Sequence, residues 1–161
     1  MSKVRNHKTF IDHRGSFTPI DLKCGPESVK KWLQANISIN PEKYTFRGLH
    51  YQSFETAQSK YIKVVQGKII DFLYDLETKE VEWFELNDQE AIFVNKNKAH
   101  GFLTLEPNTI VTYLTDNYYS PEHEHSIPWH SVSKIVEVII GKVNHVGDIV
   151  ISDKDKLGKW I

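Results

Sequence analysis

The sequence has a single cysteine, no excess of either charge and no long apolar run, and each shortage excludes a class of protein. Cys24 stands alone among 161 residues, which excludes an intrachain disulfide and a cysteine-rich zinc site and favours a reducing compartment. Twenty Lys and Arg balance 21 Asp and Glu, so there is no cationic excess typical of proteins that bind nucleic acid or anionic membranes. The start, MSKVRNHKTF, has no apolar signal-peptide core. We therefore expect a cytoplasmic protein without nucleic-acid or membrane partners.

Short alternating runs separated by turn residues dominate the chain, and they predict an all-β protein. Regular spacing of such runs favours an antiparallel barrel or sandwich over βαβ units. The length suits one well-filled core, so residues 1–161 are expected to form one domain. A helix is predicted over Glu27–Leu33. The predicted strands are Lys8–Ile11, Ser16–Leu22, Gln34–Ile39, Phe46–Gln52, Tyr61–Val65, Ile69–Leu76, Val81–Leu86, Ala91–Val94, Gly101–Leu105, Thr109–Thr115 and Val136–Ile140.

The stretch Tyr44–Gln66 places a guanidinium, an imidazole and an ammonium among apolar neighbours. Arg47 and His50 are three apart, an offset that puts two side chains on opposite faces of a regular strand. Gly48 lies between them, and a glycine inside a strand often marks a bulge, which changes the side chains that share a face. Taken singly, each cation is an ordinary surface or core residue. Together with Lys60, they predict a functional site.

Several motifs occur in one order along almost the whole chain, from about Asp12 to Asp155. They read RGLHYQ, AQSK, QGKIIDFLYDL, AHGFL, YYSPEHE, IPW and ISDKD. This series resembles the dTDP-4-dehydrorhamnose 3,5-epimerase family of nucleotide-sugar enzymes. The resemblance implies a cupin fold, a double-stranded β-helix or jelly-roll barrel with short flanking helices. It also implies a homodimeric isomerase that acts on a nucleotide-diphosphate 4-keto sugar without a cofactor or metal.

Epimerisation next to a ketone requires a base on one face of the sugar, an acid on the other and a positive group near the enolate oxygen. His50 is the predicted base, because an imidazole titrates near the working pH. Lys60 is the predicted enolate stabiliser. The resemblance assigns the proton donor to Tyr113 and the carboxylate that orients His50 to Asp155. Asp71, a carboxylate within an apolar strand, is an additional or competing partner for His50.

Further positions that match the family are predicted to bind substrate. The guanidinium of Arg47 suits a diphosphate, because its planar fork binds phosphate oxygens in pairs. The resemblance also implies a shared active site, in which one subunit contributes nucleotide contacts to the other. The remaining binding positions it implies are Gln34, Asn36, His100, Tyr119, Arg14 and Phe17, the last two across the dimer interface.

Three alternatives remain open at this stage. One is a metal-binding cupin that uses His50, Glu55 and His100, although Gln52, a poor ligand, stands where a second histidine would be expected. Another is an enzyme with the same base that inverts C3 alone or moves the keto group of a GDP- or dTDP-sugar. The third is a non-catalytic sugar-binding cupin. Departures from the family pattern at residues 95–97 and at His130 leave the nucleotide and the sugar undecided.

Overall fold

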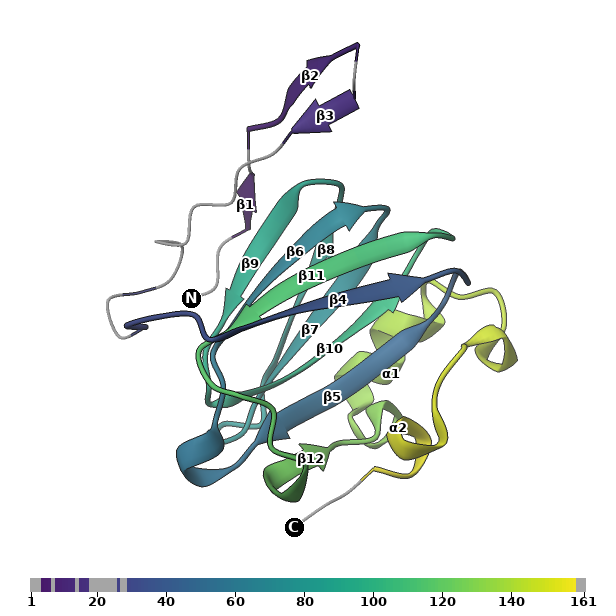
Figure 1. Ribbon diagram of the computed structural model, residues 1–161. Helices are drawn as coiled ribbons and strands as arrows, with labels where there is room; N and C mark the ends of the chain where they lie inside the picture. Colours follow the sequence, from purple (N-terminus) through teal and green to yellow (C-terminus); the bar gives the residue numbers. More distant parts are fainter. Residues whose placement is uncertain (1–3, 7, 14, 18–25, 27–28, 159–161) are drawn as a thin grey trace.

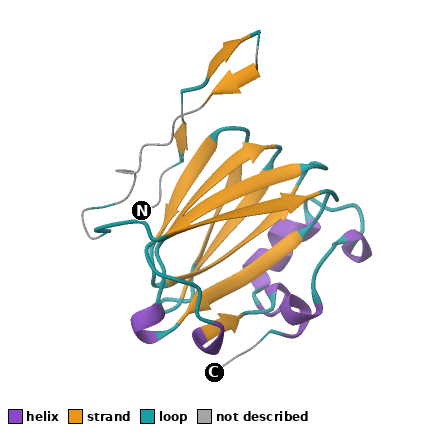
Figure 2. Ribbon diagram, viewed as in Figure 1, coloured by secondary structure: helices purple, strands orange, loops and turns teal. Residues whose placement is uncertain are grey.

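A computed structural model describes residues 4–6, 8–13, 15–17, 26 and 29–158, and it consists mainly of two antiparallel sheets that face each other (Figures 1 and 2). The first sheet has the strand order β1-β9-β6-β11-β4 and the second β12-β5-β10-β7-β8, while β2 pairs with β3. The strands are β1 (Arg5–Asn6), β2 (Phe10–Asp12), β3 (Gly15–Phe17), β4 (Gln34–Asn40), β5 (Phe46–Gln52), β6 (Lys60–Gln66), β7 (Ile69–Asp75), β8 (Val81–Leu86), β9 (Glu90–Val94), β10 (Lys98–Thr104), β11 (Thr109–Thr115) and β12 (Glu124–Ser126). The helices are η1 (Phe54–Thr56), η2 (Pro121–His123), η3 (Trp129–Ser131), α1 (Ser133–Ile140), η4 (Val146–Asp148) and α2 (Asp153–Leu157).

Two apolar cores follow from the alternation of side chains along β7. Ile69 and Leu73 point between the two sheets and belong to one core, whereas Ile70 and Phe72 point to the other side and belong to a second. The second core is closed by α1, whose Ile135 is fully buried against the sheet (Figure 1). The space between the sheets is therefore lined by one face of each strand, and polar side chains occupy one end of it.

Most of the predicted strands are confirmed, although residues 18–22 of the predicted strand Ser16–Leu22 lie outside the described residues. The strand predicted over Val136–Ile140 is wrong, because this run belongs to α1. Ile135 and Ile139 are four apart and both are buried, which is the spacing of one helix face. The run is rich in β-branched residues, a composition that also favours strands. In a short run of mostly apolar residues, the two-residue period of a strand and the 3.6-residue period of a helix cannot be distinguished.

The helix predicted over Glu27–Leu33 is also wrong within Val29–Leu33, the part that the structure describes. The backbone N–H of Leu33 donates to the carbonyl of Thr115 at 2.8 Å, which extends the pairing beside β4. Trp32 packs against the rings of Tyr61 and Phe93. Tertiary contacts therefore hold this segment in a non-helical conformation, against its local helix propensity.

The bulge predicted at Gly48 is confirmed. His100 of β10 lies opposite His50, but Phe102 lies opposite Arg47, so β5 carries one extra residue. Gly48 adopts a φ of 118°, and a Cβ there would lie 2.5 Å from the Cα of Gly101. The peptide from Gly48 to the next residue is cis. The register shift at the bulge turns Arg47 and His50 toward the same cavity.

The C-terminal segment returns to this bulge. Ser152 caps α2, because its hydroxyl accepts a hydrogen bond from the N–H of Asp155 at 3.2 Å. Val150 forms a parallel bridge with Thr45, at the residue before β5. Asp155 is thereby placed beside Gly48. In the described part of the chain, every helix is too short or too polar to cross a membrane.

Candidate active site

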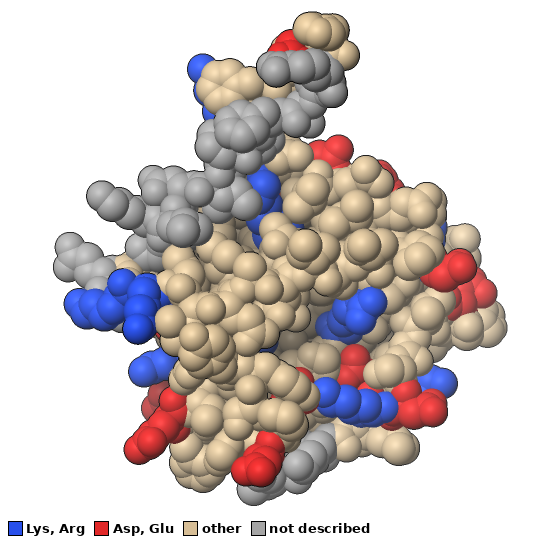
Figure 3. Space-filling model, in the orientation of Figure 1, with Lys and Arg blue, Asp and Glu red and all other residues tan. Residues whose placement is uncertain are grey.

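A cavity of about 460 Å³ opens between the edges of the two sheets, and Figure 3 shows the hollow with charged side chains around it. A smaller compartment of about 230 Å³ adjoins it. Their walls come from β4, β6 and β11 of the first sheet, β5, β10 and β12 of the second, and α2. The residues that line both compartments are Asn36, His50, Lys60, Tyr113, Tyr119 and Glu124.

His50 is held by a buried carboxylate, as predicted for Asp155. The Nε2 of His50 lies 2.6 Å from Oδ1 of Asp155, and the N–H of Gly48 donates to Oδ2 at 3.1 Å. Burial acts to raise the pKa of Asp155, but the hydrogen bonds from His50 and Gly48 and the nearby positive charge outweigh it and lower that pKa. Asp155 is therefore ionised at neutral pH and orients the imidazole. Asp153, two residues earlier, is exposed.

Asp71 is not a partner of His50, which corrects the expectation of a competing contact. Its Oδ1 lies 2.7 Å from Nε2 of His100, within a second His–Asp pair. The reason is strand order: β10 lies between β5 and β7, so His100 stands between Asp71 and His50. Asp71 is fully buried, and its second oxygen has no hydrogen-bond partner among the residues that the structure describes. His100 reaches the cavity wall as expected for a binding residue.

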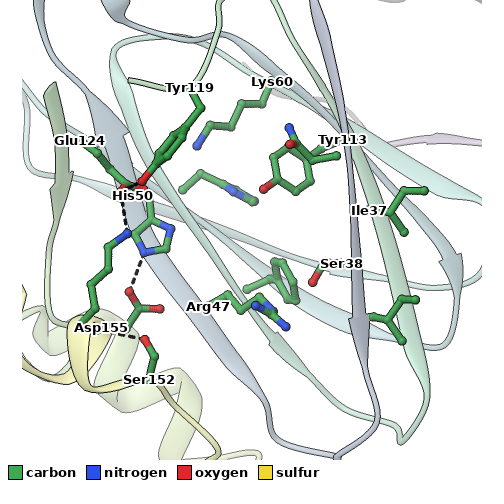
Figure 4. Close-up of a pocket in the computed structure, with 15 residues that line it drawn as sticks. Ile37, Ser38, Arg47, His50, Lys60, Tyr113, Tyr119, Glu124, Ser152 and Asp155 are labelled. Carbon is green, nitrogen blue, oxygen red and sulfur yellow. Dashed lines mark hydrogen bonds and ion pairs between the residues drawn. The ribbon is translucent and has the colours of Figure 1, made fainter. Parts of the chain in front are cut away.

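The ammonium of Lys60 points into the cavity from β6 (Figure 4). The residue is 8% exposed, and within the described chain its Nζ makes no hydrogen bond or ion pair. Burial lowers the pKa of Lys60 to about 8, although the charges of Glu124 and Asp71 oppose the shift. The side chain is therefore still mainly protonated at pH 7, and its donors are available to a ligand.

Tyr113 reaches the same cavity from β11. Figure 4 shows its hydroxyl on the side opposite the His50 ring, with the Lys60 ammonium directed into the space between them. Burial raises the pKa of Tyr113, and the charge of Arg47 partly offsets this effect. The phenol therefore keeps its proton at neutral pH, so its hydroxyl has a proton to donate.

Polar residues extend the site along both walls. Arg47 is exposed toward the cavity, and its Nε donates to Oδ1 of Asn40 at 2.8 Å. The side chain of Gln34 donates to Oδ1 of Asn36 at 2.8 Å and accepts from the backbone N–H of Tyr119 at 3.1 Å. The predicted binding residues of β4 and of the segment after β11 are thus brought together.

Sequence reasoning missed an ion pair at the cavity rim. Oε2 of Glu124 lies 2.6 Å from Nζ of Lys154 and accepts a hydrogen bond from the Tyr119 hydroxyl at 2.8 Å. Both charged residues line the cavity. Burial acts to raise the pKa of Glu124, but the hydrogen bonds from Lys154 and Tyr119 lower it overall. The signal was present, because these residues lie within the motifs YYSPEHE and ISDKD.

Two predicted binding residues are not placed. Arg14 lies outside the described residues, and only the backbone of Phe17 is described, in β3. The amide of Gln52, considered as a metal ligand, instead accepts from the N–H of Ser120 at 2.8 Å and donates to the carbonyl of Tyr118 at 3.1 Å. Among the described residues, no three His, Cys, Asp or Glu side chains are grouped to hold a metal ion.

Comparison with known proteins assigns the chain to a family. The sequence model of the dTDP-4-dehydrorhamnose 3,5-epimerase family matches residues 3–161. The chain belongs to this family. The enzyme of that name from Methanothermobacter thermautotrophicus is 32% identical over 133 residues, which span 78% of this chain and 69% of the relative. The Salmonella typhimurium enzyme is 32% identical over 134 residues, or 76% and 73% of the two chains.

Solved structures of family members have the same fold. The epimerase from Bacillus anthracis, with TDP and PPi bound, is 32% identical with a TM-score of 0.77, and the match covers 97% of this chain and 91% of that one. The Legionella pneumophila enzyme, in complex with dTDP-4-keto-L-rhamnose, is 26% identical with a TM-score of 0.81, covering 98% and 86%. The predicted cupin fold, family and isomerase class are confirmed.

Proposed function

We propose that the chain epimerises C3 and C5 of a dTDP-linked 4-keto-6-deoxy hexose, without a cofactor. The observation that carries this proposal is the placement of the His50 imidazole and the Tyr113 hydroxyl on opposite sides of one cavity, with the Lys60 ammonium directed between them (Figure 4). Two relatives support dTDP as the nucleotide: the B. anthracis structure holds TDP, and the L. pneumophila structure holds a dTDP-linked keto sugar.

In the proposed mechanism, His50 removes the proton from the carbon next to the ketone. The electron pair moves onto the ketone oxygen, and the Lys60 ammonium stabilises the resulting enolate. Tyr113 then donates its proton to the same carbon from the opposite face, which inverts the centre. The resulting imidazolium and phenolate return to their starting forms by proton exchange with solvent. Asp155 stabilises the imidazolium formed in the first step.

The substrate diphosphate is proposed to bind at Arg47. Arg47 and Lys154 both line the cavity, but Lys154 is already paired with Glu124. Arg47 forms no ion pair with a described carboxylate, so its charge is available to phosphate oxygens. The sugar ring then extends from Arg47 toward His50 and Lys60, with His100 and Asn36 as neighbouring hydrogen-bonding groups.

Deuterium incorporation tests the proposed reaction. Incubation in heavy water with dTDP-, GDP- and UDP-linked 4-keto-6-deoxy hexoses should place deuterium at C3 and C5 of the dTDP-linked sugar, because each reprotonation uses a solvent-derived proton. The label is located by NMR. Label at C3 alone would replace the proposal with a C3 epimerase, and migration of the keto group with an isomerase. Absence of label from every sugar would favour a non-catalytic protein.

We also propose a homodimer in which each copy completes the active site of the other. The β2–β3 hairpin stands away from the body of the chain (Figure 1), and its Phe10 and Ile11 are 51% and 81% exposed. On β4, Ile37 and Ile39 are 73% and 62% exposed. Such apolar surface is typical of a protein interface. A hairpin that reaches across to a second copy would carry the segment around Arg14 toward the partner's cavity.

Removal of the apolar contacts of the hairpin should weaken the dimer. The double substitution Phe10→Asp and Ile11→Asp is expected to raise the dimer dissociation constant about 100-fold, because the proposed interface would no longer bury these two apolar side chains. Sedimentation velocity over a range of concentrations measures the effect. Val146→Asp, at a residue that is 45% exposed in η4, is the control. A wild-type monomer, or a hairpin variant that dimerises as strongly as the wild type, would contradict the dimer proposal.

A further inference from the structure

We propose that Asn40 is a positioning residue that holds the guanidinium of Arg47 ready for the substrate diphosphate. The inference rests on the proposed function, because it assumes that Arg47 binds phosphate oxygens. It adds a role for a side chain outside the cavity lining, at the end of β4. Asn40 lies seven residues from Arg47 in the sequence and is 1% exposed.

The orientation of the Asn40 amide is determined by its surroundings. Its Nδ2 donates to the carbonyl of Thr109 at 3.1 Å and to the carbonyl of Ser38 at 3.3 Å. A flipped amide would place its oxygen against these two carbonyl oxygens, which offer no donor. Oδ1 must therefore face the other way, where it accepts from Nε of Arg47 at 2.8 Å and from the Ser38 hydroxyl at 3.3 Å.

This contact restricts a side chain that is otherwise free to move. Arg47 is exposed, and in the described chain its guanidinium forms no ion pair. The hydrogen bond from Nε uses the donor nearest the stem of the side chain and leaves the four N–H groups of the two terminal nitrogens for a ligand. An arginine that is already ordered loses less rotamer freedom when it binds phosphate, and affinity rises accordingly.

The partner is a neutral amide, and this neutrality matters for anion binding. A carboxylate at the same position could also accept from Nε of Arg47, but its second oxygen would face two carbonyl oxygens, and its negative charge would pair with Arg47 and repel the diphosphate. Asn40 orders Arg47 without neutralising it. Because Thr109 lies opposite Asn40 in the β4–β11 pairing, the anchor is part of the sheet and does not depend on a loop.

The test compares ligands with and without a diphosphate. Asn40→Ala should raise the dissociation constant of dTDP about 10-fold, the effect of losing one hydrogen bond to a charged group, and should leave binding of thymidine unchanged. Isothermal titration calorimetry measures both ligands. In steady-state kinetics with the keto sugar, kcat should stay within about twofold of the wild-type value while KM rises. The contact between Asn40 and Arg47 acts on the diphosphate, a part of the substrate that does not react.

A double-mutant cycle separates positioning from a general structural effect. Arg47→Ala alone should weaken dTDP binding about 100-fold, since a charge-assisted pair of hydrogen bonds is lost. In the Arg47→Ala background, Asn40→Ala should cause no further loss. Asn40→Ser serves if the alanine variant fails to fold, because its hydroxyl can donate to one of the two carbonyls that Nδ2 contacts. Its side chain is one bond too short to place an acceptor where Oδ1 lies, so dTDP binding should still weaken.

The possible results are distinct. Full dTDP affinity in folded Asn40→Ala or Asn40→Ser, with weakened binding in Arg47→Ala, would overturn the role of Asn40 and leave the proposed function intact. Equal losses for Asn40→Ala in the presence and absence of Arg47 would also overturn it. Unchanged dTDP affinity in Arg47→Ala would instead remove the proposed diphosphate contact itself. A loss for dTDP that depends on Arg47 and is absent for thymidine supports the inference.

Discussion

Replacement of His50 by alanine should lower kcat about 1,000-fold, the contribution expected of a general base. The imidazole is held 2.6 Å from Asp155 by a contact across 105 residues of sequence, and it faces a cavity that also receives Lys60 and Tyr113. None of these neighbours replaces it, because Lys60 is mainly protonated at pH 7, and Tyr113 keeps its proton. Deuterium exchange at the carbon next to the ketone should fall by the same factor.

The affinity for dTDP should change by less than about threefold in the same variant, because His50 is proposed to contact the sugar and not the diphosphate. Coupled-assay kinetics, NMR of the exchange and calorimetry with dTDP measure the three quantities. His145→Ala is the control, since this histidine is exposed and its ring accepts from Gly147 N–H outside the cavity. If His50→Ala retained activity within about tenfold of the wild type, a different group would have to be the base.

The substitution Tyr113→Phe should separate proton removal from inversion. It deletes the hydroxyl that faces the cavity and keeps the ring, so His50 still removes the substrate proton and can return a solvent-derived one to the same face. Net epimerisation should fall about 100-fold, the usual effect of losing a general acid. Exchange with solvent deuterium should continue within about tenfold of the wild-type rate, and the exchanged centre should retain its configuration.

A matched control is available on the other side of the second sheet. Tyr74, on β7, packs against the core that α1 closes, so Tyr74→Phe tests for effects of removing a phenol far from the cavity. It should leave exchange and inversion unchanged. Loss of exchange and inversion together in Tyr113→Phe would mean that Tyr113 positions substrate and is not the acid. Normal inversion would assign the proton donor to another group of the cavity wall, such as His100, which is paired with Asp71.

The two variants are informative together, because their exchange phenotypes differ. His50→Ala removes the step that both exchange and inversion require, whereas Tyr113→Phe removes only the second proton transfer. An enolate stabilised by Lys60 forms in the second variant and not in the first. The pair therefore tests the order of events as well as the identity of each group.

The side chains of the site were predictable from the motifs in which they lie, but most contacts between distant segments were not. Arg47, His50, Lys60 and Tyr113 were predicted, and all four line one cavity. The bulge that turns two of them to one face was predictable too, because Gly48 is a local signal. The partner of Asp71 was not, since its contact with His100 depends on β10 lying between β5 and β7.

The sequence by itself determined the family, the strand-rich composition and the reactive side chains, because motifs and alternation are local properties of the chain. The contact of His50 with Asp155, across 105 residues, was expected from the family resemblance. Only the tertiary structure decided the other partners: Asp71 for His100 across 29 residues, and Lys154 for Glu124 across 30. It also decided that the run ending at Ile140 is a helix, because α1 covers an otherwise exposed sheet face. Register, strand order and burial set these outcomes, and each arises only when distant segments pack.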